Sequence, residues 1–420
     1  MQASQPLSIV VVGAGISGLT AAIALGKQGH RVVVLEKSKF NRETGAAINL
    51  APNCTAVLEW LDIDPRQFGG TVLERMDYND NQGNLKYFKD FSGVRQSWQA
   101  EYYLVHRADL HNALKDRARQ TAEIHTGCKI VDIDISTNRP SVTLDDGRIF
   151  KGDLLIGADG LNSIVRNQIA PEASPPTPSD KSCFRWLLPA SDLRQLAVTK
   201  DVVQPGVFIE WAAPKSRLVV YPCSDNEILN LCAFIPTADA GELGQGWESS
   251  GNKNALVNSF AEFSPAVREF IERADDDLKV WQLFDMEALP RWVTGRAALI
   301  GDSAHPFQPF LGQGGAMAIE DAVSLAILLP LGTALEDIPS RLSLYETARR
   351  PRVEMTLKYT RLNGRDEGDV LATKITAAEM VRFMEIVISH NEVVHSTAIM
   401  QDYLLGNISS TRNIVVEPRA

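Results

Sequence analysis

The stretch of sequence that decides the fold is residues 7–36, LSIVVVGAGISGLTAAIALGKQGHRVVVLE. It opens with a continuous apolar run, residues 7–12, which is typical of a strand buried on both faces of a parallel sheet. A glycine-rich turn follows, then a segment with helical spacing, residues 19–28, and a second apolar run, residues 31–35. Strand, turn, helix and strand within about thirty residues predict a βαβ unit.

The turn carries Gly13, Gly15 and Gly18 in the spacing GxGxxG, and Glu36 stands at the end of the second apolar run. Such glycines allow a tight turn that brings backbone N–H groups and a helix N-terminus against a pyrophosphate. An acid at this strand tip accepts hydrogen bonds from adenosine ribose hydroxyls. The alternative is a plain strand-to-helix turn with a solvated glutamate, which the order of these features disfavours. The unit predicts dinucleotide binding without choosing between FAD and NAD(P).

Two later glycine turns favour FAD. Residues 157–166, GADGLNSIVR, follow an apolar strand predicted over residues 151–156. Residues 301–306, GDSAHP, follow another predicted over residues 296–300, and the cluster GQGGA at 312–316 precedes a helix. Ligands of open α/β sheets lie outside the carboxyl ends of the strands, so these turns would converge with the first on one extended ligand.

Within these turns, Asp302 is placed to bind the ribityl hydroxyls of a flavin. The backbone amides around Gly315 and Ala316, at the N-terminus of the following helix, can face the N1–C2=O edge of the flavin. There they would stabilise negative charge on the reduced ring. We therefore predict that the chain binds FAD non-covalently.

At these three motifs the chain resembles the group A FAD-dependent aromatic hydroxylases, which share the fold of para-hydroxybenzoate hydroxylase. It looks most like the salicylate hydroxylases and the fungal FAD-dependent monooxygenases of secondary metabolism. The resemblance covers roughly the first 350 residues, and three motifs in the same order make it specific. It implies hydroxylation of an electron-rich aromatic substrate, phenol- or salicylate-like or a polyketide, through a flavin C4a-hydroperoxide. NADH or NADPH would reduce the flavin transiently, since no second GxGxxG is present.

The same resemblance implies three further cofactor contacts. Arg107 matches the family arginine that contacts the phosphate and ribose region of FAD. A Gly-Ala-Ala segment ending at Ala47 matches the small residues packed along the flavin, and Asp159 matches an aspartate linked to FAD and nicotinamide contacts. The alternative for Arg107 is a surface arginine at a helix N-terminus. The alternative for Asp159 is a turn aspartate that caps Asn162 or Ser163.

The predicted fold class is α/β: a Rossmann-type FAD-binding lobe with an inserted antiparallel-sheet substrate lobe and C-terminal helices. Residues 1–172 and 286–362 are predicted to form the FAD-binding domain in two parts. Residues 173–285 begin with a proline-rich crossover and consist of short β segments with one helical stretch, residues 254–273, which predicts the inserted substrate-binding sheet. Residues 363–420 are predicted to form a C-terminal helical segment. Within it, the mixed apolar and polar residues 377–405 leave a dimer contact and a lid open as alternatives.

Strand alternation places Arg185 in an otherwise apolar row of one inserted strand, and Tyr221 as the one hydroxyl in a row of another. A guanidinium there is costly unless it is paired or faces a functional cavity. Related fungal monooxygenases place an arginine and a tyrosine at matching points beside the substrate. We predict that Arg185 pairs with a phenolate or carboxylate, or donates to the distal hydroperoxide oxygen, and that Tyr221 hydrogen-bonds the substrate hydroxyl. The alternatives are a salt bridge from Arg185 to Glu210 and a core tyrosine with a satisfied hydroxyl.

Other polar features are interpreted as structural. His305 lies inside the GDSAHP motif before a proline, which favours a structural or flavin-packing role over a general base. The basic cluster at residues 349–352 is interpreted as a solvated, salt-bridged helix face. The seven histidines are scattered and no HExxH is present, so no metal site is predicted.

The composition is that of an ordinary globular protein, with 45% hydrophobic and 22% charged residues, and the formal net charge of −10 disfavours a nucleic-acid partner. The N-terminus lacks the features of a signal peptide, and no apolar stretch is long enough for a membrane span. The five cysteines are odd in number and contain no CxxC pair. These features predict a cytoplasmic protein with reduced thiols. We expect a monomer or a homodimer.

The sequence also bears on rival classes. Flavin-dependent halogenases share the fold but carry a WxWxIP motif, and class B monooxygenases need a second dinucleotide turn; both are absent. An indole-alkaloid epoxidase or hydroxylase of the same family, an FAD dehydrogenase or oxidase, and a flavin-binding redox sensor remain alternatives. The expected partners are an aromatic small molecule, O2 and NADH or NADPH.

Overall fold

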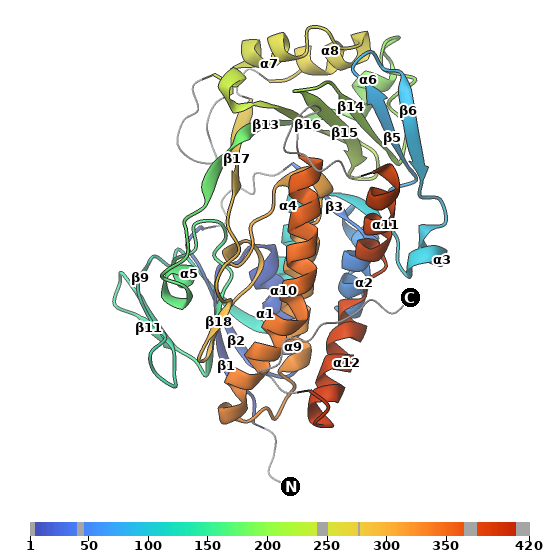
Figure 1. Cartoon of the computed structure of the whole chain (residues 1–420). Helices are drawn as coiled ribbons and strands as arrows, with labels where there is room; N and C mark the ends of the chain where they lie inside the picture. The colour runs from blue at the N-terminus through green and yellow to red at the C-terminus, as the bar shows by residue number, and fades with distance from the viewer. Residues whose placement is uncertain (1–4, 40–45, 242–250, 276–277, 365–375, 409–420) are drawn as a thin grey trace.

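The computed structural model describes residues 5–39, 46–241, 251–275, 278–364 and 376–408. The protein has two lobes, one around each of its two large sheets, and a group of long helices that runs along the N-terminal lobe (Figure 1). Among the described residues, no helix combines the length and apolar character needed to cross a membrane.

The N-terminal lobe contains a six-stranded sheet in the order β18-β19-β12-β1-β2-β8. Every neighbouring pair is parallel except β18 with β19. The central strand β1 is almost wholly buried, as predicted for the apolar run near the start of the chain. The strands span Ser8–Val12 (β1), Arg31–Glu36 (β2), Ala122–Thr126 (β8), Leu154–Gly157 (β12), Val293–Thr294 (β18) and Ala297–Leu299 (β19).

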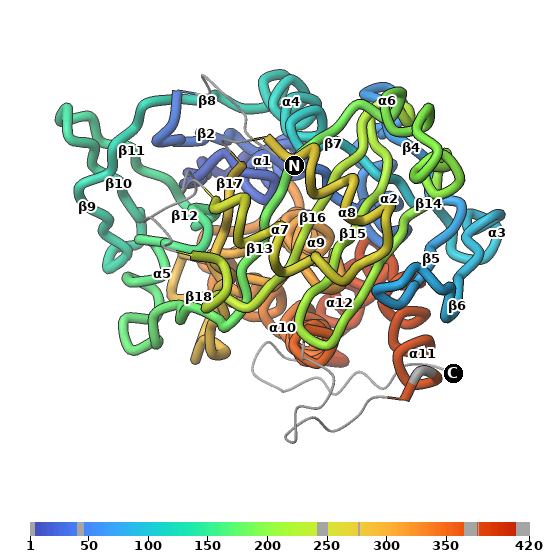
Figure 2. Tube along the Cα trace, turned by 90° about the horizontal axis from the view of Figure 1, so that it is seen from above, coloured from blue at the N-terminus to red at the C-terminus, as the bar shows by residue number. Residues whose placement is uncertain are grey.

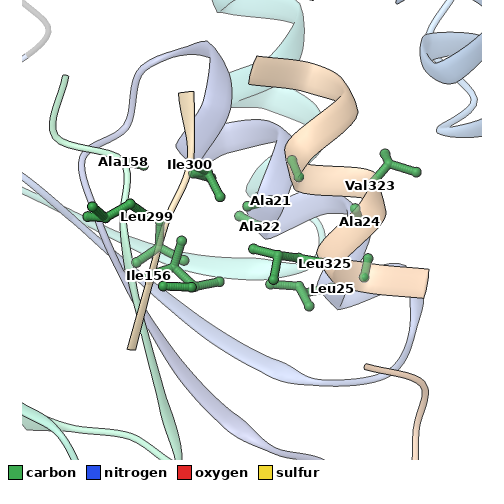
Figure 3. Close-up of a cluster of buried hydrophobic side chains, with 14 of the residues drawn as sticks. Ala21, Ala22, Ala24, Leu25, Ile156, Ala158, Leu299, Ile300, Val323 and Leu325 are labelled. Carbon is green, nitrogen blue, oxygen red and sulfur yellow. The ribbon is translucent and has the colours of Figure 1, made fainter. Parts of the chain in front are cut away.

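Helix α1, Ile16–Lys27, packs against this sheet through small residues. Ala21, Ala22 and Ala24 are fully buried and leave room for helix α9, Gly314–Leu328, to lie against α1 (Figure 3). The core of the lobe therefore joins segments from distant parts of the chain.

The single strand predicted over residues 151–156 is in fact two strands. A Cβ on Gly152 would lie 2.8 Å from the Ser8 carbonyl oxygen, and the Asp153 carboxylate accepts a hydrogen bond from the Ser8 amide (2.8 Å). These contacts interrupt the strand just before β12. The residues that precede the interruption pair with a different sheet. They form a small antiparallel sheet of β9 (Ile130–Asp134), β10 (Ser141–Leu144) and β11 (Ile149–Lys151).

The second lobe contains a seven-stranded sheet, here called the roof sheet, in the order β17-β13-β16-β15-β14-β5-β6. Figure 2 shows its strands passing over the N-terminal lobe, with β5 and β6 at one edge. The predicted inserted strands are present, as β13 (Thr177–Pro189), β14 (Val207–Ala212), β15 (Arg217–Cys223), β16 (Ile228–Pro236) and β17 (Lys279–Asp285).

Two strands of the roof sheet come from outside the predicted insertion. They are β5, Arg75–Asp80, and β6, Leu85–Asp90, which the sequence places in the first part of the FAD-binding domain. Because β5 pairs with β14 in parallel, the roof sheet is mixed rather than purely antiparallel. Both strands are rich in polar residues and mostly exposed or half-buried, so they lack the apolar alternation that marks a strand.

Helices cover the outer face of the roof sheet, and the N-terminal lobe lies below its inner face (Figure 1). The one helix predicted over residues 254–273 is divided into α7, Lys253–Ser259, and α8, Pro265–Glu272. Pro265 begins α8 because proline is favoured in the first turn of a helix and disfavoured in its interior.

A third sheet and further helices lie between and beside the two lobes. The sheet contains β3 (Ala47–Leu50), β7 (Tyr103–His106) and β4 (Thr71–Val72). The helices are α2 (Pro52–Trp60), α3 (Val94–Trp98), α4 (Arg107–Ala118), α5 (Ile164–Ile169), α6 (Ala190–Arg194), α10 (Ile338–Asn363), α11 (Ala377–Ile388) and α12 (Glu392–Leu404).

Candidate active site

The three glycine turns meet at one edge of the six-stranded sheet. They follow β1, β12 and β19, which are adjacent and parallel, so their carboxyl ends lie together. Backbone hydrogen bonds connect them: the Ala158 amide donates to the Val12 carbonyl (2.8 Å) and the Ile300 amide to the Gly157 carbonyl (3.0 Å). The predicted convergence of the turns is confirmed.

The glycines of the first turn serve two purposes. Gly13 has a φ of +102°, and a Cβ there would lie 2.3 Å from the Ala158 carbonyl oxygen. A Cβ on Gly18 would lie 2.0 Å from the Gly13 oxygen, so both positions require glycine for packing. A Cβ on Gly15 would instead meet nothing within 4 Å. Gly15 therefore borders open space at the N-terminus of α1, where a phosphate group can approach the backbone.

Glu36 lies beside this turn at the end of β2. Its half-buried carboxylate accepts hydrogen bonds from the Ala14 amide (2.8 Å) and the Ser38 amide (2.7 Å). These bonds orient the side chain next to the glycines, and the contact with a ribose remains a prediction.

Asp159 caps helix α5. Its carboxylate accepts hydrogen bonds from the Ser163 hydroxyl (2.5 Å) and from the amides of Ile164 (2.7 Å) and Val165 (3.2 Å). Burial raises the pKa of this carboxyl, and the hydrogen bonds oppose the shift. The capping role considered for Asp159 is therefore present with Ser163, and a cofactor contact remains a prediction.

Asp302, in the third turn, has an exposed carboxyl group. Desolvation by the surrounding protein nevertheless raises its pKa, while His305, Arg107 and Arg166 lower it. An accessible carboxyl within a partly enclosed, basic setting suits an acceptor for ligand hydroxyls. Arg166 was not singled out from the sequence, and it joins the second turn to the third by donating to the Ser303 carbonyl (3.1 Å).

Helix α9 begins at this edge, so Gly315 and Ala316 lie in its first turn. A Cβ on Gly315 would lie 2.6 Å from Cδ1 of Ile48, which shows how closely β3 packs against the helix start. Ala47 is the residue before Ile48, at the beginning of β3. Gly45, at the start of the small-residue segment, lies outside the described residues.

The protein groups at this edge fit FAD. Two buried polar atoms near the start of α9, Nε2 of Gln313 and Oδ1 of Asn49, have no hydrogen-bond partner among the described residues. Buried groups of this kind normally bind a ligand or water. Together with the open space at Gly15 and the half-buried Arg107, they offer phosphate and flavin contacts along one edge.

Arg185 and Tyr221 lie on the same face of the roof sheet. Arg185 in β13 pairs in register with Cys232 of β16, which pairs with Val219 of β15, and Tyr221 follows Val219 by two residues. Cys232, Val219 and Tyr221 belong to one core cluster with Ala47 of the third sheet. The two predicted substrate residues are therefore on the inner face, toward the glycine turns.

Arg185 has no carboxylate partner among the described residues. Its Nε donates to Sγ of Cys183 (3.5 Å), and its guanidinium lies 5.8 Å from the centroid of the Trp281 ring. Glu210 forms its ion pair with Arg217 (3.6 Å), so the alternative salt bridge from Arg185 to Glu210 is absent. A half-buried guanidinium without a carboxylate partner among the described residues therefore lies on the inner face.

Tyr221 is buried, and its ring stacks on Phe208 with centroids 5.5 Å apart. Its hydroxyl makes no hydrogen bond with a described residue, which does not fit the alternative of a satisfied core tyrosine. Burial raises the pKa of Tyr221 well above its usual value, and Arg185 offsets only part of this shift. The hydroxyl therefore stays protonated and can donate a hydrogen bond.

Asn230 connects the roof sheet to the third sheet, a role that was not predicted. It is fully buried in β16, and its side-chain oxygen accepts a hydrogen bond from the Ala47 amide (2.9 Å). Its Nδ2 donates to Sγ of Cys232 (3.4 Å), and it stands in register between Leu187 and Tyr221. The available signal was a lone amide side chain within an otherwise apolar strand.

The basic cluster of α10 forms salt bridges as predicted, but Arg349 and Arg352 are buried, so the prediction of a solvated face is wrong. Arg349 is fully buried and binds Asp321 (2.9 Å) and Glu392 (2.6 Å). Arg352 is also buried and binds Glu320 (2.8 Å). The reason is tertiary: α9 and α12 pack on α10 and enclose these arginines together with the carboxylates.

His305 lies in the same buried setting. Its Nε2 is 2.6 Å from Oδ2 of Asp321, and its ring packs 4.9 Å from Trp292 between centroids. This geometry supports the structural interpretation of His305.

A surface hollow of about 620 Å³ lies away from the turns, between α2, α3 and β7. Its arginines Arg66 and Arg95 are already paired with Asp64 and Glu59. The hollow therefore offers no unpaired cation for the predicted ligand.

Comparison with known proteins decides the family. Residues 7–360 match the family described as FAD binding domain. The chain belongs to this family. It is an FAD-dependent monooxygenase by its relatives: it is 32% identical over 375 residues to hispidin-3-hydroxylase of Neonothopanus nambi, covering 83% of this chain and 86% of that protein. It is 31% identical over 363 residues to 3-hydroxybenzoate 6-hydroxylase 1 of Aquipseudomonas alcaligenes, with 84% and 88% covered.

The fold of the monooxygenase agrees with this membership. A salicylate hydroxylase in complex with its substrate superposes with a TM-score of 0.78 at 22% identity, covering 94% of this chain and 98% of that one. At this identity the comparison establishes the fold alone. The predicted α/β fold is thereby confirmed. The predicted FAD cofactor is confirmed by the match to the FAD binding domain family.

Proposed function

We propose that this monooxygenase hydroxylates a phenolic ring that carries an acidic group, with NADH or NADPH as the reductant. Arg185 would bind the anionic group of the substrate, and Tyr221 would hydrogen-bond its hydroxyl. The observation that carries the proposal is a pair of polar groups on the inner face of the roof sheet. The Arg185 guanidinium has no carboxylate partner among the described residues, and the Tyr221 hydroxyl makes no hydrogen bond with any of them.

The spacing of the two groups suits a single aromatic ring. Arg185 and Tyr221 are two strands apart and displaced by two residues along the strands, which separates their backbones by about 12 Å. Cys232 and Asn230 stand between them on β16 and are held in place by their mutual hydrogen bond (3.4 Å). A planar ring that carries two polar groups would contact both side chains, and two contacts would set which carbon faces the cofactor.

The relatives support this substrate class. One is a 3-hydroxybenzoate 6-hydroxylase, whose named substrate carries a carboxylate and a phenolic hydroxyl on one ring. Another is a hispidin-3-hydroxylase. A guanidinium and a neutral hydroxyl donor are the chemical complements of a carboxylate and a phenol.

The chain's own residues would bind, orient and shield the substrate. FAD supplies the activation of O2 once it has been reduced. The roof sheet and its buried inner cluster exclude water, which strengthens the contact between Arg185 and an anion. The raised pKa of Tyr221 keeps its proton on the hydroxyl, so this residue positions the phenol rather than removing its proton.

A matched substrate set tests the proposal. Purified FAD-loaded protein is mixed with NADH or NADPH and with one of four compounds: salicylate, 3-hydroxybenzoate, benzoate or phenol. The rate of NADH or NADPH consumption and the mass of the product are measured. We expect the hydroxybenzoates to accelerate consumption most and to gain about 16 Da, the mass of one inserted oxygen. Loss of about 2 Da would instead indicate dehydrogenation.

Two variants test the residues. Arg185→Met should raise KM for hydroxybenzoates by about 10- to 100-fold, because a charge-assisted bond is lost, while Arg185→Lys should retain part of the affinity. Tyr221→Phe should lower kcat/KM by about 5- to 10-fold. Near-normal turnover of both variants at full FAD occupancy would contradict the assignment.

A further inference from the structure

Helix α12 places a charged residue inside the protein. Glu392 is fully buried, and its Oε2 accepts a hydrogen bond from Nη1 of Arg349 (2.6 Å) and lies 2.8 Å from Nε2 of His390. Its other oxygen accepts a hydrogen bond from the Ser396 hydroxyl (2.6 Å), which in turn bonds the Ser324 hydroxyl of α9 (2.7 Å). A buried carboxylate with three partners is held in one position.

The same arginine continues this chain of contacts toward the third glycine turn. Nε of Arg349 donates to Oδ1 of Asp321 (2.9 Å). The other oxygen of Asp321 accepts a hydrogen bond from the Gly301 amide (2.9 Å) and lies 2.6 Å from Nε2 of His305. Gly301 and His305 flank Asp302, the predicted ribityl ligand. Three successive polar contacts therefore connect α12 to the cofactor edge: Glu392 to Arg349, Arg349 to Asp321, and Asp321 to Gly301.

The charges of this cluster are closely balanced. Glu320, Asp321 and Glu392 are three buried carboxylates, and Arg349 and Arg352 are two buried guanidinium groups. Loss of one carboxylate leaves Arg349 shared between only two acids. Asp321 and Glu392 both bind the planar guanidinium group of Arg349. A change at Glu392 therefore shifts this guanidinium and, with it, the position of Asp321.

The carboxylates of Glu320 and Glu392 lie with His390 in an arrangement that could hold a metal ion. Their oxygens, however, already accept hydrogen bonds from Arg349 and Arg352. Two guanidinium groups at these oxygens oppose a cation, so the cluster is better explained as an ion-pair network.

We infer that Glu392 is a positioning residue for the FAD site, acting through Arg349 and Asp321 on the turn at residues 301–305. The C-terminal helix α12 is then part of the cofactor site's support, rather than a lid or a dimer contact. The inference rests on the geometry of the network and on membership of the FAD-binding family.

The test compares two substitutions on the same helix. Glu392→Gln removes the charge but keeps the size of the side chain. Ile399→Ala removes buried apolar packing and leaves the ion pairs intact. For each variant the FAD dissociation constant is measured by flavin fluorescence, the visible circular dichroism of bound FAD is recorded, and the Tm is measured with and without FAD.

Glu392→Gln should raise the FAD dissociation constant by about 5- to 30-fold, reduce the gain in Tm on FAD binding, and change the visible dichroism. Ile399→Ala should lower the Tm of both forms equally and leave the dissociation constant unchanged. Should Glu392→Gln fail to fold without FAD, Glu392→Asp, which keeps the charge on a shorter side chain, is compared in the same way and should raise the constant about 2- to 5-fold. The inference is overturned when the Glu392 variant loses stability as Ile399→Ala does, with unaltered FAD affinity and dichroism.

Discussion

The carboxyl edge of the six-stranded sheet and the inner face of the roof sheet are built on different principles. At the edge, the groups that would meet the cofactor are largely backbone amides, held by glycines with unusual φ angles and by capping carboxylates such as Asp159. On the inner face, they are side chains, Arg185 and Tyr221, that project from ordinary strands.

This difference bears on how each site tolerates change. A backbone site depends on local geometry, so a single added methyl group can destroy it. A side-chain site on a regular sheet can change its polar groups while the strands stay in place. Substitutions at the cofactor edge should therefore lower both the stability and the FAD affinity of the protein. Substitutions on the inner face should mainly change which substrate is bound. The following experiments test that contrast, beginning with the largest expected effect.

Arg349→Met should cause the largest loss, because Arg349 supports the cofactor edge from inside the protein. Its removal leaves Glu392 and Asp321 without their main counterion, at a cost of roughly 3–5 kcal/mol in the free energy of unfolding. The neighbouring Arg350→Met is the control, with an expected cost of about 1–2 kcal/mol, since Arg350 is half-buried and lies over the Trp292 ring. Urea unfolding measures both. Equal losses would mean that the buried network contributes little.

Gly13→Ala should cost roughly 2–4 kcal/mol and abolish FAD binding, because it combines strain at a positive φ with a clash against Ala158. Gly15→Ala should change the stability of the FAD-free protein by less than about 0.5 kcal/mol, since nothing lies near its Cβ. It should still weaken FAD binding by filling the open space. The flavin content and the Tm of the FAD-free protein distinguish the two variants. If Gly13→Ala keeps the yellow colour of bound FAD, the cofactor edge does not depend on the backbone geometry at Gly13.

Asn230→Ala removes the hydrogen bond that connects the roof sheet to β3. It leaves the buried Ala47 amide without its acceptor, which should cost about 1–3 kcal/mol in the free energy of unfolding. We also expect weaker substrate binding, because the roof sheet loses its fixed position over β3. Denaturant unfolding and KM values check this. The control is Asn84→Ala, which removes the same amide group from an exposed position. Unchanged stability would show that water replaces the amide.

The smallest effect should be a change in acid sensitivity. Burial alone raises the pKa of Glu392, but Arg349 and His390 outweigh it, so the native-state pKa lies below the usual value of 4.5. The folded protein then binds fewer protons than the unfolded chain. The contribution of Glu392 to the free energy of unfolding is fully present above about pH 5. It decreases as the pH falls toward the native-state pKa. Glu392→Gln should show a shallower decrease between about pH 5 and pH 3 in unfolding experiments; an identical slope would exclude this contribution.

The elements that the sequence predicts well are those with strong local signals. Strands β1 and β2, helix α1 and the three turns were predictable because buried apolar runs and glycines with forced geometry leave few alternatives. Alternation along each strand also predicted which neighbours share a face with Arg185 and with Tyr221. Which face is the inner one was decided by the packing of the roof sheet. Strands β5 and β6 were missed because they are polar and partly exposed, and they join the roof sheet only through contacts distant in sequence.

What the sequence by itself determined is the cofactor edge: GxGxxG with Glu36 and the two later turns specify a parallel sheet and an FAD site, because their constraints lie within a few neighbouring residues. Only the tertiary structure decided the partners of each charge. Arg349 looks like a surface arginine in its helix, and it becomes a buried link once α9 and α12 enclose it. Arg185 does not form the salt bridge considered for it, since Glu210 pairs with Arg217 instead. Ion pairs depend on distances across the fold, and no local pattern encodes them.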